Sequence, residues 1–258
     1  MSNNKNLTTY SNRFPLISCL CVTHRKPHFL LRAINCFEQQ DYPNKELIIV
    51  YEADDQATSG FLQGLRPTFH IHLVCISKHK KLTLGELRNI SIANANGAFL
   101  CQWDDDDWYS PIRLSVQYDV IVRSGKKGSI LTKWLLFNYD NNFAYISNNR
   151  PWEGSLLCEK QSMKQIGYIS ANKGEDTPMI DGLIAMKILN FIPDRPELYV
   201  YTYNGYNTWD EKHFSSIFAC SQKLGIKDSE IIKDIMINGK NKEIELSVLP
   251  ETIHNQKV

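Results

Sequence analysis

Four consecutive aspartates, Asp104 to Asp107, stand between two tryptophans and directly follow the apolar run 98–101. Four carboxylates this close together repel one another strongly, and a fold tolerates them when a cation, or a ligand that brings one, neutralises the site. Mg²⁺ and Mn²⁺ choose carboxylate oxygens, and magnesium is commonly held by one or two carboxylates together with substrate phosphates. The motif therefore predicts a metal-assisted site for a phosphate-bearing substrate. The alternative is a solvated acidic turn that caps the next helix.

The elements that must position this motif are visible as apolar runs separated by helical patterns. Short apolar runs predict buried strands over residues 16–23 and 98–103, and two further strands are predicted over 46–52 and 71–76. Helical spacing, proline at a first helical position and a capping box predict helices from Pro27 to before Asp41, from Thr83 through Asn96, and over 112–123. We expect Gly97 to end the second of these helices in the left-handed conformation. Strands that alternate with helices predict an α/β fold with a doubly wound, mostly parallel sheet.

Polar side chains follow three of the predicted strands. They are Thr23, Glu52 and Asp104. Ligands bind at the carboxyl ends of the strands in such sheets, so we expect these three groups to lie around one site.

The pattern changes after about Gly125. Shorter elements are expected there, namely β-like pieces over 129–138, 143–147 and 155–159, a helix over 175–189 and a strand over 197–203. We therefore divide the chain into a flexible N-terminus (1–13), a Rossmann-like nucleotide-binding half (14–124), a mixed α+β acceptor-side half of the same domain (125–222) and a helical tail (223–258).

Composition excludes several classes of protein. The 258 residues carry 29 basic and 28 acidic side chains, for a net charge of +1, which gives no reason to expect nucleic acid or an anionic membrane as the main partner. The seven cysteines are odd in number and form no C-x-x-C pair, which indicates a reducing compartment rather than a zinc or redox site. No run is long enough for a membrane span and no signal peptide is visible. We expect a cytoplasmic protein, with peripheral membrane attachment left open.

Taken in order, the motifs resemble those of family 2 glycosyltransferases of the GT-A fold over roughly residues 16–214. The matching segments are Thr23-His24-Arg25, Gln40-Asp41-Tyr42-Pro43, Glu52-Ala53-Asp54-Asp55, Gly85-Glu86-Leu87-Arg88-Asn89 with Gly97, Trp103 with Asp104 to Asp107, Gly174-Glu175-Asp176, and Asn207-Thr208-Trp209 with His213-Phe214. One departure is that the second strand, which usually ends in Asp-Asp-Gly-Ser, here ends in Tyr51-Glu52-Ala53-Asp54-Asp55.

The resemblance implies inverting transfer from a nucleotide-sugar donor, usually a UDP-sugar, with Mn²⁺ or Mg²⁺ as cofactor. It places Asp104 near the ribose, makes Asp106 and His213 metal ligands, and makes Asp176 the general base with Glu175 beside it. The acceptor would be a glycan, lipid-linked or protein hydroxyl, and surface glycan synthesis is the expected context.

Other residues receive roles by their place in these motifs. The expected contacts of the nucleotide sugar are Thr23, Arg25, Glu52, Arg88, Asn89 and Asp105, with Glu52 the candidate for the base. Asp107 is expected to contact the acceptor or cap a helix. Trp152 either stacks on a sugar face or packs in the core. Glu175 and Asp176 also suit a helix N-terminus, and the two readings are compatible.

Three rival classes remain. A sugar nucleotidyltransferase usually has a glycine-rich phosphate loop after its first strand, and segment 24–27 contains no glycine. A two-metal phosphodiesterase or nuclease would have more scattered Asp and His ligands. A non-catalytic, carbohydrate-binding relative would have lost metal or base residues, and none is missing here.

Overall fold

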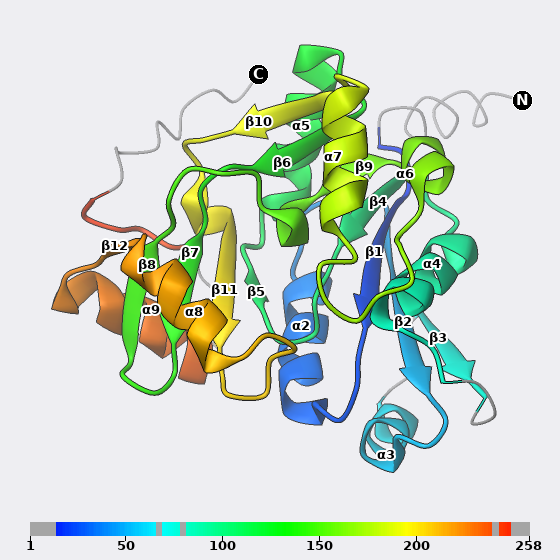
Figure 1. Cartoon of the computed structure of the whole chain (residues 1–258), viewed down its shortest axis with the longest axis horizontal. Coiled ribbons are helices and arrows are strands. Elements are labelled where there is room, and N and C mark those ends of the chain that lie inside the picture. The colour runs from blue at the N-terminus through cyan, green and yellow to red at the C-terminus, as the bar shows by residue number, and fades with distance from the viewer. Residues whose placement is uncertain (1–13, 66–68, 78–80, 239–242, 249–258) are drawn as a thin grey trace, which may run out of the picture.

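The computed structural model describes residues 14–65, 69–77, 81–238 and 243–248 and contains two sheets (Figure 1); the predicted flexible stretch 1–13 lies outside these residues. The larger sheet has the order β10-β6-β9-β4-β1-β2-β3. Its strands are β1 (Ile17–Val22), β2 (Lys45–Glu52), β3 (Ile71–Ile76), β4 (Phe99–Gln102), β6 (Gly128–Leu131), β9 (Leu157–Glu159) and β10 (Leu189–Ile192). All its neighbours pair in parallel except β9, which is antiparallel to both β4 and β6.

A smaller sheet has the order β12-β8-β7-β11-β5. Its strands are β5 (Trp108–Tyr109), β7 (Leu135–Asn138), β8 (Phe143–Ile146), β11 (Tyr199–Tyr203) and β12 (Gln222–Lys223). The helices are α2 (Pro27–Glu38), α3 (Gln56–Gly64), α4 (Leu84–Asn94), α5 (Arg113–Ser124), α6 (Lys160–Ile166), α7 (Thr177–Ala185), α8 (Glu211–Ala219) and α9 (Ile226–Asn238), with 3₁₀ turns η1 (Glu153–Ser155) and η2 (Pro196–Leu198). No helix among the described residues is long and apolar enough to cross a membrane.

Side chains of the central strands are buried on both faces of the larger sheet, which is why these strands read as continuous apolar runs. In β2, Leu47 and Ile49 join one buried cluster and Ile48 and Val50 join the other. The first cluster includes α2, α5 and the smaller sheet, and the second includes α4, α6 and α7. The larger sheet is therefore covered on both faces, as Figure 1 shows with α4 and α7 in front of it and α5 behind, and the predicted doubly wound α/β fold is confirmed.

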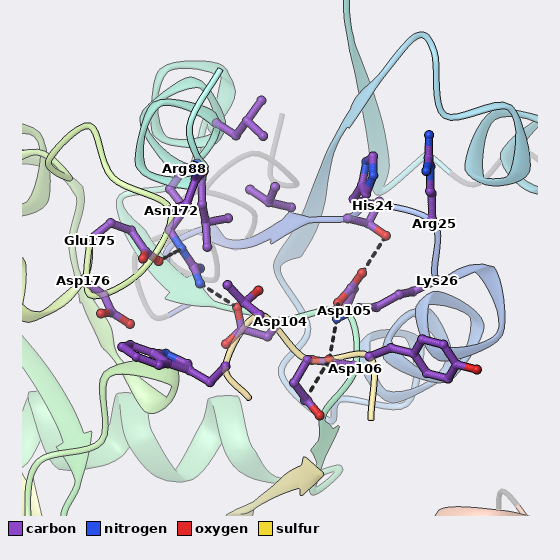
Figure 2. A pocket seen from close by; sticks show the side chains of 18 of the residues that line it. His24, Arg25, Lys26, Arg88, Asp104, Asp105, Asp106, Asn172, Glu175 and Asp176 are labelled. Carbon is purple, nitrogen blue, oxygen red and sulfur yellow. Dashed lines mark hydrogen bonds and ion pairs between the residues drawn. The ribbon is translucent and has the colours of Figure 1, made fainter. Parts of the chain in front are cut away.

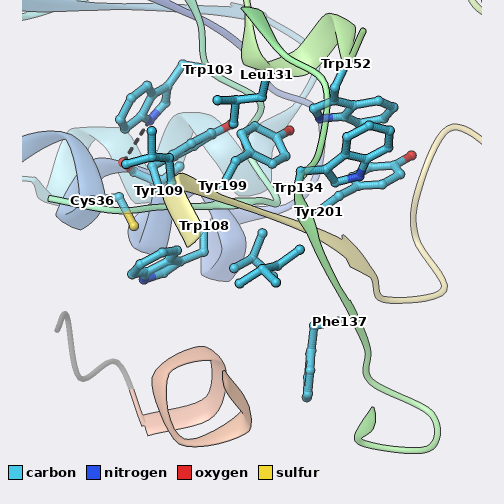
Figure 3. Packing of buried hydrophobic residues seen from close by; sticks show 14 of the residues in the cluster. Cys36, Trp103, Trp108, Tyr109, Leu131, Trp134, Phe137, Trp152, Tyr199 and Tyr201 are labelled. Atoms are coloured by element: carbon cyan, nitrogen blue, oxygen red, sulfur yellow. Dashed lines mark hydrogen bonds between the residues drawn. The ribbon is translucent and has the colours of Figure 1, made fainter. Parts of the chain in front are cut away.

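An aromatic core joins the two sheets (Figure 3). The rings of Trp103 and Tyr109 lie 3.9 Å apart between centroids, and Tyr109 meets Tyr199 edge-on at 5.2 Å. The fully buried guanidinium of Arg113 lies 4.7 Å from the Tyr109 ring centre, a distance at which a cation and an aromatic face attract each other. This packing holds the turn that contains the aspartates in place on the side that faces the aromatic core.

Several predicted boundaries are wrong beyond the first half. The predicted β-like segment 129–138 is two strands, β6 and β7, and they belong to different sheets. The predicted helix 175–189 ends at Ala185, and β10 begins at Leu189. Helices α3, α6 and α8 and the short strand β5 were not predicted, because each depends on packing that local periodicity does not report.

Gly97 does not end a helix in the left-handed conformation. Helix α4 closes earlier, with Ala95 extended as its cap residue, and Gly97 is not among the described residues with positive φ. Glycine is required instead by close approach: a Cβ there would lie 2.7 Å from both Leu16 O and Ser18 N. The chain at Gly97 passes directly against β1, where only a residue without a side chain fits.

We expect Gly97→Ala to lower the free energy of unfolding by about 1–3 kcal/mol, because backbone atoms on β1 must shift to admit the methyl group. Gly60→Ala is the matched control, since Gly60 lies within α3 and a Cβ there meets nothing within 4 Å. That change should stabilise the protein by about 0.5–1 kcal/mol. Urea denaturation of both variants measures the difference, and equal effects would contradict the steric account of Gly97.

Candidate functional site

A cleft of about 850 Å³ opens where β1, β2 and β4 end. Thr23, Glu52 and Asp104, the polar residues predicted to meet at these ends, all line it. The opposite wall comes from the loop before α7, with Asn172, Glu175 and Asp176. Figure 2 shows Asp104 to Asp106 between these two walls. The structure thus gathers the polar strand ends and the Glu-Asp motif around one space.

The four aspartates form a tight turn between β4 and β5, and each carboxylate has its own partners. Asp105 accepts a hydrogen bond of 2.7 Å from Thr23 Oγ1. Asp106 Oδ2 lies 2.7 Å from Lys26 Nζ, and Asp104 Oδ1 accepts from Arg88 Nη2 at 3.1 Å. Burial raises the pKa of Asp105 to about 7, although the positive charge of Lys26 acts against this shift. The charge of the turn is therefore distributed to separate parts of the fold.

Asp107, expected at the acceptor or at a helix cap, has its carboxylate elsewhere. The residue is fully buried, and its Oδ1 accepts a 2.9 Å hydrogen bond from the backbone N–H of Thr202 on β11. The Tyr199 hydroxyl donates to its other oxygen. Burial raises its pKa well above the ordinary value. In the first turn of helix α5 the N–H of Leu114 donates to Gln40 Oε1 at 3.1 Å, so Asp107 does not cap this helix. Asp107 instead holds the acidic turn against β11 of the smaller sheet.

Arg88 connects the two walls of the cleft. Its Nε donates to Glu175 Oε1 at 2.8 Å while Nη2 reaches Asp104, and its side chain is 10% exposed. Burial raises the pKa of Glu175, and the charge of Arg88 opposes that shift. The loop can approach this closely because residue 85 is glycine, where a Cβ would lie 1.9 Å from Ile169 O. A guanidinium held by two acids in this way positions both of them.

Asp176 lies beside Glu175 but has a different environment. It is half-buried and lines the cleft, and in Figure 2 its carboxylate faces the space in front of Asp104. It occupies the N-cap position of α7, yet its side chain makes no cap hydrogen bond within the described part of the chain. Its carboxylate is thus available to a molecule in the cleft.

Two residues that were predicted to contact the nucleotide sugar, Asn89 and Arg25, are placed differently from the other predicted contacts. Both ends of the Asn89 amide are bonded to the backbone of Tyr168, at 2.8 and 2.9 Å, and Asn89 does not line the cleft. Arg25 lines the cleft rim, but in Figure 2 its side chain runs away from the aspartates. Asn89 therefore holds the loop after α6 against α4.

The acids at the end of β2 differ in whether they face the cleft. Asp55 caps α3 through Thr58 N at 3.0 Å and also accepts from Arg25 N at 2.6 Å, and it is fully buried. Glu52 and Asp54 line the cleft. The two acids accessible to a ligand at this position are therefore Glu52 and Asp54.

Trp152 packs in the core, which was the second of the two roles predicted for it. Its ring stacks on Trp134 with centroids 4.6 Å apart and meets Tyr201 at 4.5 Å on a tilt (Figure 3). Its indole edge contributes to the cleft wall, but these rings cover its faces. A sugar cannot stack on them as placed.

His213 does not join the aspartates. Its ring stacks on Trp209 with centroids 4.3 Å apart, and it is not part of the cleft lining. Burial lowers the pKa of His213. The positive charges of Arg150 and Lys173 lower this pKa further, and the negative charge of Asp210 opposes the shift. The structure therefore gives His213 the role of supporting Trp209, which does line the cleft.

Three residues that contact Asp106 were not predicted as site residues, and two of them, Lys26 and Asn207, line the cleft. Lys26 follows the first strand, and Asn204 and Asn207 lie in the loop after β11, with amides 3.3 and 3.2 Å from Asp106 Oδ2. Lys173 Nζ lies 5.1 Å from the centre of the Trp209 ring, so the loops before α7 and after β11 touch across the cleft. Two of these residues had a signal in the sequence: Lys26 is a cation shortly after a predicted strand, and Asn207 belongs to the matching segment Asn207-Thr208-Trp209.

The site suits a divalent ion in its donor chemistry. Asp104 and Asp106 offer hard carboxylate oxygens at the cleft, the type that Mg²⁺ and Mn²⁺ prefer. Within the described residues, no three His, Cys, Asp or Glu side chains are grouped so as to hold a metal. An all-protein cage is not needed, because magnesium is commonly held by one or two carboxylates and substrate phosphates. The residues therefore fit an ion that arrives with a phosphate ligand.

Comparison with known proteins gives a consistent result. The sequence model of the family described as Glycosyl transferase family 2 matches residues 18–181. A curated relative from Escherichia coli (strain K12), "Putative colanic acid biosynthesis glycosyl transferase WcaA", is 34% identical over 109 residues, which cover 40% of this chain and 36% of the relative. This match spans about a third of the relative's length.

Solved structures share the fold at low identity. The S. aureus TarS 1-349 structure in complex with UDP-GlcNAc has a TM-score of 0.60 and 14% identity, over 74% of this chain and 60% of that chain. The mannosyltransferase PcManGT from Pyrobaculum calidifontis, in complex with GDP-Man and Mn²⁺, has a TM-score of 0.57 and 13% identity, over 73% and 56% of the two chains.

We expect Arg88→Met to destabilise the protein by about 2–4 kcal/mol, because it leaves two carboxylates, Asp104 and Glu175, without their cation. Arg123→Met is the control: Arg123 pairs with Asp119 on the surface, and its side chain is 79% exposed. That pair is worth at most about 0.5 kcal/mol. Chemical denaturation of both variants measures the change in the free energy of unfolding for each. Equal changes would show that Arg88 has no structural role.

Proposed function

Because the chain belongs to glycosyl transferase family 2, we propose that it moves a sugar from a nucleoside-diphosphate sugar, with UDP-sugars as the donor class, to an acceptor hydroxyl with inversion at the anomeric carbon. The observation that carries this proposal is the single cleft in which the ends of β1, β2 and β4 face Asp176. Ligands bind at such strand ends in doubly wound sheets, and the carboxylate opposite supplies a base.

The donor half of the cleft offers groups suited to each part of a nucleotide sugar. We assign the base and ribose to Glu52, Asp54 and Asp104, which line the side of the cleft formed by the carboxyl ends of β2 and β4. We assign the diphosphate to the region of Lys26 and Asp106, where a divalent ion, Mn²⁺ or Mg²⁺, would be held by Asp106 and Asp104. Bound there, the ion offsets the negative charge of the departing diphosphate. Mn²⁺ is supported by its presence in the PcManGT complex.

Asp176 is proposed as the general base. Inverting transfer requires the acceptor hydroxyl to lose its proton as its oxygen attacks the anomeric carbon from the face opposite the diphosphate. A half-buried carboxylate without a cap bond can accept that proton on an Oδ atom. Glu175 is held by Arg88, so we give it a positioning role at the base of the same loop.

The acceptor is proposed to be a growing glycan, for which the support is the name of the colanic acid biosynthesis relative. We propose a cytoplasmic setting because all seven cysteines, each within the described residues, are free thiols, the usual state in a reducing compartment.

The first test is release of nucleoside diphosphate from a panel of UDP-, GDP- and dTDP-sugars, with Mn²⁺ or with a chelator. We expect one donor to be hydrolysed slowly without acceptor and only with the ion, and Asp106→Ala to abolish this release. Asp119→Ala, which removes a half-exposed surface carboxylate on α5, should leave it unchanged. If no donor is hydrolysed or bound, the cleft is not a transferase site.

The second test addresses the base. Asp176→Asn should lower the rate of sugar transfer at least about 100-fold, because the acceptor proton has no carboxylate to accept it, while the affinity for the nucleoside diphosphate stays near that of the wild type. Asp181→Asn alters an exposed carboxylate on the same helix and should have no effect. A transfer rate in Asp176→Asn within threefold of the wild type would assign the base elsewhere. ¹H NMR of the product measures its anomeric configuration.

A further inference from the structure

We propose that Lys26 is a built-in cation of the donor site, which holds Asp106 while no divalent ion is bound and competes with that ion for the same carboxylate. The inference rests on the proposed function in one respect, because it takes the cleft to be where the ion and a nucleoside diphosphate bind.

Lys26 is directed into the cleft by a loop held at several points. Thr23 N donates to Val50 O at 3.0 Å, and Arg25 N donates to the carboxylate of Asp55. Arg25 has a left-handed backbone with φ of 55°, which is uncommon for a residue with a side chain. In Figure 2 the Arg25 side chain accordingly points away from the aspartates and the Lys26 side chain points toward them.

The ammonium group lies against two carboxylates. Its Nζ is 2.7 Å from Asp106 Oδ2 and 3.7 Å from Asp105 Oδ1, and the side chain is only 17% exposed. The amides of Asn204 and Asn207 also donate to that Asp106 oxygen. One oxygen of the carboxylate that a metal ion would bind is therefore already satisfied by three donors from the chain itself.

An ammonium and a divalent ion cannot share this oxygen at contact distance, because their positive charges repel strongly in a partly buried site. Binding of the ion must therefore move the ammonium away, and this requirement lowers the affinity of the empty cleft for the ion. A diphosphate reverses the effect, because its oxygens offer the ammonium a new partner on the flexible four-carbon stem. Ion and diphosphate then strengthen each other's binding by the same factor.

The other buried cation of the cleft does not suit this role. Arg88 is bonded at once to Asp104 and Glu175 on opposite walls, so its release would separate both. Lys26 makes its contacts through a single Nζ atom, and it can leave them without breaking a link between the walls.

The test is direct titration of the protein with Mn²⁺, followed by the electron paramagnetic resonance signal of the free ion. We expect Lys26→Met to bind Mn²⁺ at least about tenfold more tightly than the wild type, since its competing charge is removed. Lys81→Met is the control, because Lys81 lines the cleft and its loss changes net charge equally; it should alter the affinity less than threefold. Equal affinity of Lys26→Met and wild type would overturn the proposal.

A second titration measures the coupling. UDP should raise the Mn²⁺ affinity of the wild type by at least about tenfold more than it raises that of Lys26→Met. The same enhancement in both proteins would overturn the proposed exchange of the ammonium to the diphosphate. If Lys26→Met does not fold, as judged by circular dichroism, Lys26→Gln is measured against the same predictions.

The double variant Lys26→Met/Asp106→Asn distinguishes competition at Asp106 from a general charge effect. Its Mn²⁺ affinity should fall to that of Asp106→Asn alone, and retention of the tighter binding would overturn the assignment. This inference and the proposed function can fail separately. Tighter Mn²⁺ binding by Lys26→Met without turnover of any donor supports the competition and refutes the transferase, and donor turnover with unchanged Mn²⁺ affinity does the reverse.

Discussion

Adjacent like charges in a partly buried turn must each be compensated, and the cleft is organised by that requirement. The carboxylates of residues 104–107 are met by Arg88 from α4, by Thr23 and Lys26 from the loop after β1, and by residues of β11 and its following loop. Because these partners come from three separate parts of the fold, compensation of the charge also fixes how those parts are placed relative to one another. The hydrogen bonds and ion pairs that offset the repulsion between these carboxylates therefore also position the walls of the site.

Much of the first half of the fold could be predicted from local pattern. Strands β1, β2 and β4 are largely buried apolar runs, whereas β3 at the edge of the sheet is partly exposed. The polar residues that follow β1, β2 and β4 meet where a parallel sheet brings strand ends together. The second half could not be predicted as well, because sheet membership there depends on long-range pairing. The β-like segment 129–138 has only Thr132 and Lys133 in its interior to mark a break, yet it divides between two sheets. Gly97 is a second example. Glycine is required there because the chain passes directly against β1, and a helix-end pattern in the sequence carries no information about that contact.

The candidate site shows a similar division. The sequence located the aspartates and the Glu-Asp pair, since these are short motifs at predictable strand and helix ends. It could not assign the direction of each carboxylate. Asp107 faces β11, 95 residues further along the chain, and the faces of Trp152 are covered by Trp134 and Tyr201. His213 supports Trp209. Each outcome depends on a partner distant in sequence, so neither periodicity nor motif spacing could have identified it.

The bonds from Asp106 and Asp107 to β11 and its loop have a consequence for how the protein is made. They join residues 95, 98 and 101 positions apart, so they form only after about four-fifths of the chain has left the ribosome. Contacts between residues this far apart in the sequence form late in folding, because closing the long loop between them costs entropy that must be offset first. A nascent chain thus carries the acidic turn without the cleft. Ligands that bind only the finished cleft stabilise the completed fold alone, so they act on the product of synthesis and not on its intermediates.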